Sequence, residues 1–334
     1  MIGFGKMTAI AAAAAVLAAG GQAAGPGPAV VERIAGPDGG WDLLSVDPDH
    51  RRLLVARSDG VMAVDLSTGA VTARFVPGAR LHAVLAIPHS HLGLATSGQT
   101  NQALIFDTAT GAVRAAVPTG ANPDAAIYDP RSRTIWVMNA KDGTATVIDP
   151  AGAKAVATVA IGGALELPAL DGRGHLFVNV EDRNEIAEVD IARRRVVRRI
   201  PLAGCDEPTG LAYLGSDMLV SACANGVAKL VRASTGKALG DIAIGPRPDG
   251  AFYDAARRRA YIPSGGDGTL TVIDTSGRLP RAIARVATQT AARTGAVDPA
   301  TGKVYLPAAR FTPPAAPGQR PKMVPGSFEV LVVG

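Results

Sequence analysis

Seven polar positions recur about every 42 residues along this chain of 334 residues, and five of them carry an acid. Carboxylate oxygens are the ligands that Ca²⁺ and Mg²⁺ prefer, so Asp124 and Asp249 are candidate metal ligands. A ring of such acids could also bind an amine or a basic peptide. The alternative is that the acids make turn hydrogen bonds, since Asp is a common turn residue. The seven positions are Asp38, His82, Asp124, Glu166, Glu207, Asp249 and Arg293.

A second set of polar residues follows short apolar runs. Its two arginines, together with Arg293, could hold a carboxylate through bidentate hydrogen bonds, or they could pair with neighbouring acids. Its two asparagines could donate to a ligand or satisfy backbone groups at a turn. The members are Arg57, Ser97, Asn139, Asn179, Ser264 and Arg310.

A sequence repeat predicts the strands and turns on which these polar residues lie. A "V-I/V-D-x-x-x-G" pattern recurs with spacings of 42, 42, 41, 42 and 42 residues. One unit reads as four strands, "DAAIYDP", "TIWVMN", "TATVID" and "KAVATVAI", because each run alternates and ends at turn residues. Four strands per 40 to 45 residues are typical of a β-propeller blade. The anchor positions are Asp65, Asp107, Asp149, Asp190, Arg232 and Asp274.

The two ends of the chain predict how the ring closes. The last unit, "ARTGAVDPATGKVYLPAAR…SFEVLVVG", has three strands, and the early segment "AVVERIAG" resembles the fourth strand "RVVRRIPLAG" of another unit. We therefore predict an all-β, seven-bladed propeller in which the N-terminal strand completes the last blade. Residues 25–334 would form this single domain. Both polar sets would then lie on one face, called the top face, where blade-to-blade connections and second-to-third-strand turns meet around the channel.

The repeat resembles that of the YVTN-type β-propellers, and more narrowly that of the exported YncE-like proteins. The resemblance rests on "IWVMNAKDGTATVID" (135–149), "HLFVNVEDRNEIAEVD" (175–190) and "AYIPSGGDGTLTVID" (260–274), and it extends over essentially the whole chain after residue 24. The fifth unit departs from the pattern at Arg232. The resemblance implies the fold and leaves the function open, because propellers carry many unrelated activities.

The first 24 residues predict export. A single Lys, an apolar run of about ten residues and small residues near Ala23 and Ala24 are typical of a cleaved signal peptide; a membrane anchor is the alternative, but the run is short for one. We expect a periplasmic or secreted protein with no membrane anchor after cleavage. Cys205 and Cys223 would then meet an oxidising compartment and form a disulfide on the top face. The alternative is a thiol metal site, but two cysteines without a nearby histidine make a poor zinc site.

Two features depart from the regular ring. Basic turns at 50–52, 131–133, 193–195 and 257–259 would lie on the opposite, bottom face, either as solvated charge or as a contact for anionic lipid head groups or an acidic partner. A Pro-rich insertion, 311–327, separates the second and third strands of the last blade. It could overhang the channel mouth as a lid, serve as a docking arm, or be disordered.

Two functions of different classes fit this sequence. The favoured one is a non-catalytic, monomeric exported propeller that binds a small ligand or a periplasmic protein on its top face. The alternative is a metal-assisted lyase or hydrolase of the lactonase-like propeller kind, with His82, Asp124 and Glu166 as the nearest catalytic set. We expect no nucleic-acid partner, because aromatic residues are only 4% of the chain and the predicted ring is acidic.

Overall fold

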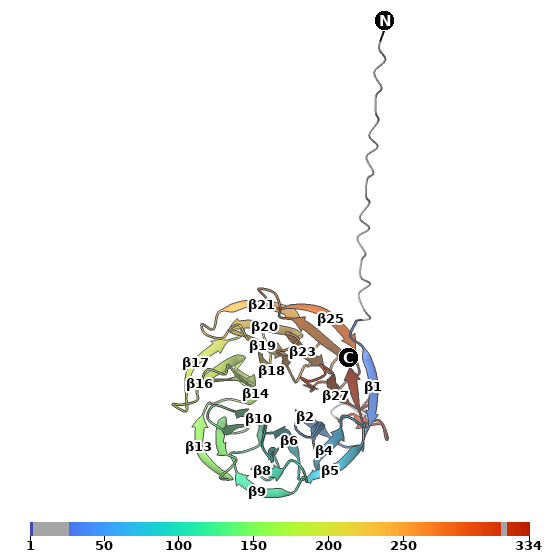
Figure 1. The fold of residues 1–334 in the computed structure, drawn as a ribbon. Coiled ribbons are helices and arrows are strands. Elements are labelled where there is room, and N and C mark those ends of the chain that lie inside the picture. Colours follow the sequence, from blue (N-terminus) through green and yellow to red (C-terminus); the bar gives the residue numbers. More distant parts are fainter. Residues whose placement is uncertain (3–26, 315–318) are drawn as a thin grey trace.

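The computed structural model describes residues 1–2, 27–314 and 319–334 and shows seven four-stranded antiparallel sheets arranged in a ring (Figure 1). The predicted signal peptide, 1–24, lies outside the described residues apart from residues 1 and 2. Within the described ranges no helix is long and apolar enough to cross a membrane. The all-β, seven-bladed propeller predicted from the repeat is therefore confirmed.

The first three blades run from the inner to the outer strand in chain order. They are blade one, β2 (Trp41–Asp47), β3 (Arg52–Arg57), β4 (Gly60–Asp65) and β5 (Val71–Pro77); blade two, β6 (Leu81–Ala86), β7 (Leu92–Ser97), β8 (Gln102–Asp107) and β9 (Val113–Pro118); and blade three, β10 (Pro123–Asp129), β11 (Thr134–Asn139), β12 (Thr144–Asp149) and β13 (Lys154–Ala160).

The next three blades repeat this order, with one short 3-10 turn, η1 (Glu181–Arg183), in blade four. They are blade four, β14 (Leu165–Leu170), β15 (His175–Val180), β16 (Glu185–Asp190) and β17 (Arg195–Pro201); blade five, β18 (Pro208–Tyr213), β19 (Met218–Cys223), β20 (Val227–Arg232) and β21 (Ala238–Ala243); and blade six, β22 (Phe252–Asp254), β23 (Arg259–Ser264), β24 (Thr269–Asp274) and β25 (Arg281–Ala287).

The last blade joins the two ends of the chain. Its strands, from the inside outwards, are β26 (Ala296–Val297), β27 (Val304–Ala308), β30 (Glu329–Val333) and β1 (Val30–Ala35). β1 pairs antiparallel with β30, from Val30 opposite Val333 to Ala35 opposite Glu329. The predicted closure by the N-terminal strand is confirmed, and Figure 1 shows β1 on the outer edge beside the C-terminus.

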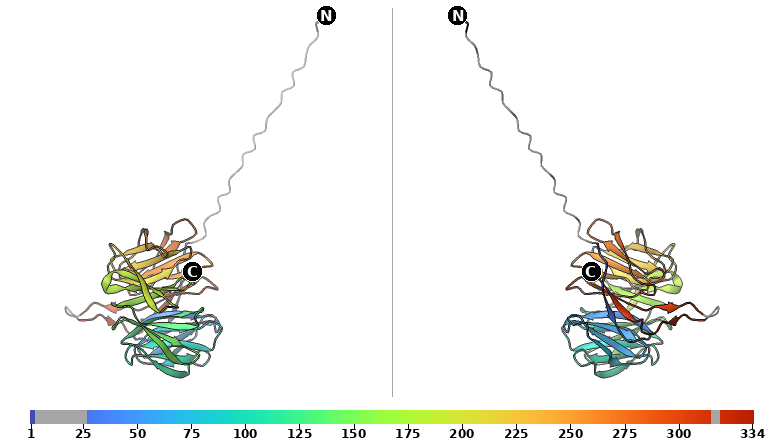
Figure 2. Two further views of the ribbon diagram at one scale, coloured as in Figure 1. Left: turned by 90° about the vertical axis from the view of Figure 1, so that its left-hand side faces the viewer. Right: turned by 90° about the vertical axis from the view of Figure 1, so that its right-hand side faces the viewer.

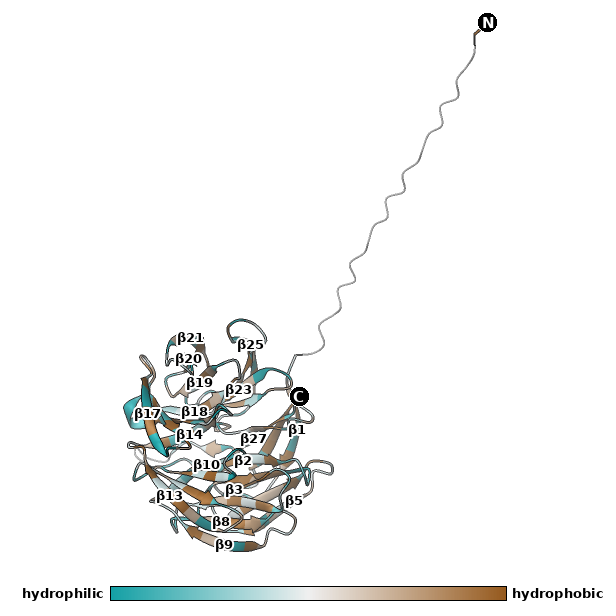
Figure 3. Cartoon of the chain, turned by 60° about the vertical axis from the view of Figure 1, so that its left-hand side comes forward, coloured by the Kyte–Doolittle hydropathy of each residue, from teal (hydrophilic) through white to brown (hydrophobic). Residues whose placement is uncertain are grey.

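Burial follows position within the blade. The second and third strands are almost wholly buried, whereas the fourth strand has one face in solvent, as in β12 and β13. Val, Ile, Leu and Ala from adjacent blades pack into clusters between the sheets, as the low aromatic content predicts. Figure 3 shows extensive hydrophilic colour on the outer strand β17.

The repeated Asp fixes the turn between the third and fourth strands. Asp65 Oδ1 accepts hydrogen bonds from the backbone N–H groups of Ser67 and Thr68, at 2.8 and 2.9 Å. The other anchor aspartates cap their turns in the same way, for example Asp107. These bonds satisfy turn N–H groups that the sheet leaves unpaired, so the repeated acid belongs to the scaffold.

Blade five has Arg232 at the anchor position and uses a different acid. Asp217, from the turn before β19, accepts from the Ser234 backbone N–H at 2.8 Å and from its hydroxyl at 2.5 Å. The Arg232 guanidinium lies 3.6 Å from the same carboxylate. The turn of the fifth unit is therefore capped although its anchor position holds Arg232, because the Asp217 carboxylate of the neighbouring turn accepts the hydrogen bonds.

Candidate functional site

Five titratable side chains gather where the inner strands begin on the top face, around the channel. We call them the mouth cluster: Asp42, His82, Asp124, Glu166 and Asp249. The inner strands β2, β6, β10 and β14 surround the channel (Figure 1), and in each of these strands the cluster residue is the second residue. Four of the five were expected from the sequence, and the electrostatic coupling among the acids shows that they lie near one another.

Strand register explains why Asp42 belongs to the cluster and Asp38 does not. The residue before each cluster member pairs with the end of the second strand: Trp41 with Arg57, Leu81 with Ser97. Asp38 lies before this register begins and is exposed. Its carboxylate accepts from the backbone N–H of Gly326 at 2.6 Å and of Phe328 at 3.3 Å. It therefore anchors the end of the insertion, and Asp42 is the residue that sequence reasoning missed.

The same register places Glu207 outside the mouth cluster. Pro208 pairs with Cys223, so Thr209 occupies the cluster position of blade five. The Thr209 hydroxyl donates to the Pro248 carbonyl at 2.9 Å and is buried. Glu207 is exposed two residues earlier, in the left-handed backbone region, and its backbone N–H donates to Asn184 Oδ1 at 2.9 Å.

Burial shifts the protonation of the mouth acids. It raises the pKa of Glu166 to about 10, with the charges of Asp124 and Asp249 adding to the effect. Burial and the charge of Asp42 raise the pKa of Asp124 to about 7. Burial also raises the pKa of Asp249 to about 7, against the opposing charge of Arg293. The mouth therefore carries fewer negative charges at neutral pH than its composition suggests.

His82 forms the closest polar contact in the cluster. Its Nδ1 lies 2.7 Å from Asp42 Oδ2, and the two side chains are 13% and 23% exposed. Burial lowers the pKa of His82, but the hydrogen bond to Asp42 and the charge of Asp124 raise it, and the net pKa lies above the ordinary value. Nε2 is buried against Gly98 without a hydrogen-bond partner.

Three members of the mouth cluster could hold a metal ion. One ligand atom from each of Asp42, His82 and Asp124 lies within 4.8 Å of the others. An imidazole nitrogen with two carboxylates suits Zn²⁺ or Mn²⁺ better than the Ca²⁺ or Mg²⁺ suggested by acids alone. Asp249 is not part of this group, because its carboxylate lies 3.0 Å from Arg293 Nε.

Arg57 and the two asparagines of the second polar set are buried inside the ring. Arg57 donates to the carbonyls of Pro37, Gly39 and Gly40, at 2.6, 3.2 and 3.0 Å. Asn139 donates to two threonine hydroxyls of β12. Asn179 donates to the Thr209 and Gly210 carbonyls and accepts from the Ser221 hydroxyl. Each of the three therefore donates within the scaffold, although Asn139 Oδ1 is buried without a hydrogen-bond partner among the described residues.

Arg310 and Arg293 have different surroundings. Arg310 is exposed at the base of the insertion, where its backbone bonds Val324 and Ser327. Arg293 is paired with Asp249, which is the alternative that the sequence left open. Of the three arginines proposed as a basic sector, Arg57 is thus engaged by backbone carbonyls and Arg293 by a carboxylate, whereas Arg310 is exposed.

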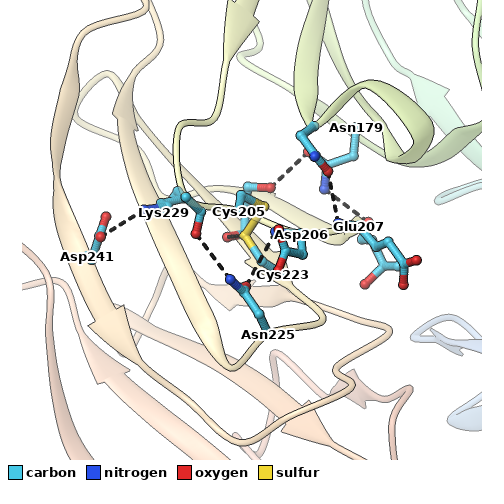
Figure 4. Close-up of a disulfide and its surroundings, with 12 residues drawn as sticks. Asn179, Cys205, Asp206, Glu207, Cys223, Asn225, Lys229 and Asp241 are labelled. Carbon is cyan, nitrogen blue, oxygen red and sulfur yellow. Dashed lines mark hydrogen bonds and ion pairs between the residues drawn. A yellow bond between two sulfur atoms is a disulfide. The ribbon is translucent and has the colours of Figure 1, made fainter.

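The disulfide between Cys205 and Cys223 is confirmed (Figure 4). It ties the loop before β18 to the end of β19, with Cα atoms 5.4 Å apart, and both residues are buried. Asn225 supports the same loop by donating to the Gly204 carbonyl at 3.2 Å. The covalent bond thus holds the start of blade five on the top face.

A pocket of about 740 Å³, which we call the top pocket, opens between blades six, seven and one. Among the described residues, its lining contains three arginines, Arg247, Arg293 and Arg320, and no acid. Trp41 and Phe311 form an aromatic wall with ring centroids 6.1 Å apart.

The insertion builds one side of the top pocket. It contains a short hairpin, β28 (Phe311–Thr312) and β29 (Lys322–Met323). Phe311, Arg320, Pro321 and Met323 of this segment line the pocket. Figure 2 shows the hairpin projecting beyond the body of the ring.

Arg247 and Arg320 were not predicted as site residues. Arg247 stands in "RPDGA", which reads as a turn, and Arg320 lies in the insertion, where no repeat fixes its neighbours. The signal that could have found them is composition: the insertion places an aromatic residue and basic residues in a segment otherwise rich in Pro.

Comparison with solved structures identifies the fold. Similar structures include hydrazine synthase of Kuenenia stuttgartiensis (16% identity, TM-score 0.69, covering 86% of this chain and 96% of that one). Another is a chain of the mitotic checkpoint complex, with 12% identity and a TM-score of 0.74, covering 91% of this chain and 91% of that one. A third is U3-55K, with 13% identity and a TM-score of 0.74, covering 91% of this chain and 99% of that one. No family model matches the chain, and no curated protein matches it. At these identities the likeness shows a propeller fold and nothing more specific.

Proposed function

We propose that this protein is an exported, non-catalytic propeller that binds a small organic anion in the top pocket. The observation that carries the proposal is the lining of that pocket, in which Arg247 and Arg320 meet two aromatic rings, while the third arginine, Arg293, is paired with Asp249. Its volume of about 740 Å³ falls within the range of small-molecule sites.

The chemistry of the lining selects the ligand class. Arginine forks bind carboxylates by paired hydrogen bonds, and Arg247 and Arg320 are both exposed at the pocket. Trp41 and Phe311 offer apolar faces on which an aromatic or aliphatic body can pack. A carboxylate attached to an aromatic ring meets both requirements.

Export and family are parts of the same proposal. The disulfide supports an oxidising compartment, periplasmic or extracellular. The YVTN-like repeat supports kinship with the exported YncE-like propellers. We propose a monomer, with one ligand per ring, because the pocket is complete within one chain.

Tryptophan fluorescence tests the proposal, because the chain has two tryptophans and one of them lines the top pocket. In a Trp136→Phe background, Trp41 reports alone. Titration with benzoate and phenylacetate should give a saturable change, and Arg247→Ala with Arg320→Ala should weaken binding by about tenfold or more. Arg278→Ala, an exposed arginine in the turn before β25, is the matched control. A flat titration, or equal loss in the control, overturns the proposal.

A second candidate function rests on the group of Asp42, His82 and Asp124. If a divalent cation binds there, it would supply Lewis acidity to a carbonyl substrate, as in a lactonase-like lyase or hydrolase. The test is calorimetric titration of chelator-treated protein with Zn²⁺, Mn²⁺ and Ca²⁺, followed by lactone turnover. Asp42→Asn with Asp124→Asn should abolish the isotherm, and the absence of any isotherm removes this candidate.

A further inference from the structure

The bottom face carries a second pocket, which we call the bottom pocket. It lies between blades three and four and measures about 590 Å³. Three turns form it: the turn between β10 and β11, the turn between β14 and β15, and the turn between β16 and β17. It shares no residue with the top pocket or the mouth cluster.

The lining of the bottom pocket is basic. It contains four arginines, Arg131, Arg173, Arg193 and Arg194, and two aspartates. The net charge of these six side chains is two positive. An anion with two negative charges would neutralise it, and an anion with one would leave a charge over.

Both aspartates are already engaged by their own turns. Asp129 accepts from the Arg131 and Ser132 backbone N–H groups, each at 3.1 Å, and from the Ser132 hydroxyl at 2.6 Å. Asp190 accepts from the Arg193 backbone at 2.8 Å and from its guanidinium at 2.6 Å. The carboxylates therefore cap turns, and only Arg193 is held by one of them at short range.

Two arginines bridge the blades across the pocket. Arg131 of blade three donates to the Gly172 carbonyl of blade four at 3.1 Å. In the reverse direction, Arg194 of blade four donates to the Val156 carbonyl of blade three at 3.4 Å. Arg173, from the β14–β15 turn, is exposed at the rim. The guanidinium groups of Arg131 and Arg194 are thus placed by backbone contacts, and both retain further N–H donors.

An unpaired donor lies in the same wall. Trp136 of β11 lines the pocket and is fully buried, and its Nε1–H has no hydrogen-bond partner in the part of the chain that the structure describes. An unpaired buried donor is destabilising, so a buried polar group of this kind calls for an explanation, and a nearby ligand is one.

We propose that the bottom pocket binds a phosphate monoester. Such a group carries a charge of about −1.5 to −2 at pH 7 and three acceptor oxygens, which match the net charge and the guanidinium donors of the lining. The organic part of the ester occupies the rest of the pocket, beside the wall to which Trp136 contributes.

Trp136 provides the readout in a Trp41→Phe background. Titration with glycerol 3-phosphate and with inorganic phosphate should change Trp136 emission in a saturable way, and acetate at equal ionic strength should not. Arg131→Ala with Arg173→Ala should raise the Kd about tenfold or more, whereas Arg320→Ala in the top pocket should leave it unchanged. The two pockets have separate reporters, so one proposal can fail while the other holds.

Vesicles containing phosphatidic acid separate the two sources of the group. Co-sedimentation that is lost on Arg173→Ala assigns the site to a lipid head group, and saturable binding of the soluble ester without co-sedimentation assigns it to a free metabolite. No saturable change with any phosphate compound, or a Kd insensitive to Arg131 and Arg173, overturns the proposal.

Discussion

The Arg57 guanidinium carbon lies 3.8 Å from the centre of the Phe328 ring, which joins the first blade to the last. Both side chains are almost fully buried, at 2% and 1% exposure. With its three bonds to the carbonyls of Pro37, Gly39 and Gly40, Arg57 holds the loop that follows the closing strand. Its guanidinium is engaged at the junction between the first and last blades, which we call the seam, so Arg57 has a structural role.

Replacement of Arg57 should therefore weaken the seam. Arg57→Met keeps the apolar stem but leaves three carbonyls without a donor, and we expect a loss of about 2–4 kcal/mol in the free energy of unfolding. Urea denaturation measures it, and Arg310→Met, at an exposed position, should change stability by about 0.5 kcal/mol or less. Equal stability of the two variants would contradict the structural role.

The closing strand offers a second prediction. Deletion of residues 30–36 removes β1 and leaves β30 as an open edge of the last blade, which favours association with other chains. We expect a markedly lower melting temperature and aggregates in size-exclusion chromatography. An unchanged melting temperature would show that ring closure does not depend on β1.

Removal of the disulfide should lower stability without changing the fold. For a loop of this length, 18 residues apart in sequence, the expected loss is about 2–4 kcal/mol. The double variant Cys205→Ala, Cys223→Ala should resemble the wild type in circular dichroism and unfold at lower urea concentration. Addition of a reductant should destabilise the wild type and leave the double variant unaffected; a response in both would implicate another cause.

The mouth cluster predicts a pH dependence of stability. Glu166 has its pKa raised from 4.5 to about 10, so between these values the folded chain binds a proton that the unfolded chain lacks. Stability then falls as pH rises through this window. Asp124 and Asp249 contribute in the same direction between their ordinary pKa and about 7. The free energy of unfolding should be lower at pH 8 than at pH 5.

Glu166→Gln is the matched variant for this effect. The amide resembles the protonated acid, so the variant should lose part of the decline between pH 5 and pH 8 and be more stable than wild type at pH 8. Urea midpoints at the two pH values measure the difference. A variant with the same pH slope as wild type would show that Glu166 titrates in its ordinary range.

The fold could be predicted because the sequence of each blade contains the strand pattern and the turn residues that define the blade. The Asp that caps the outer turn recurs at a fixed spacing, and a missing fourth strand at one end matches a spare strand at the other. Arg232 is the exception to the repeated Asp, and its turn is capped by Asp217 instead. Asp217 lies 15 residues earlier in the sequence, and only folding brings the two residues together.

The site could be predicted only in part. The mouth residues of blades two, three, four and six, His82, Asp124, Glu166 and Asp249, follow the repeat. Asp38 and Glu207 have the right residue type in the wrong register. Pairing of Trp41 with Arg57 and of Pro208 with Cys223 fixes that register, and a shift of a few residues cannot be read from turn-like motifs. The top pocket needs contacts between the insertion and two other blades, which no local pattern encodes.

The pairing of β1 with β30 makes ring closure depend on two strands from opposite ends of the sequence. Residues about 300 positions apart must meet before the last blade exists, so six blades can assemble while the seam stays open. A chain cut short before β30 would leave β1 and β27 without the strand that separates them, and its unpaired edges would be open to proteases. Only a chain that carries both β1 and β30 can form this closed blade.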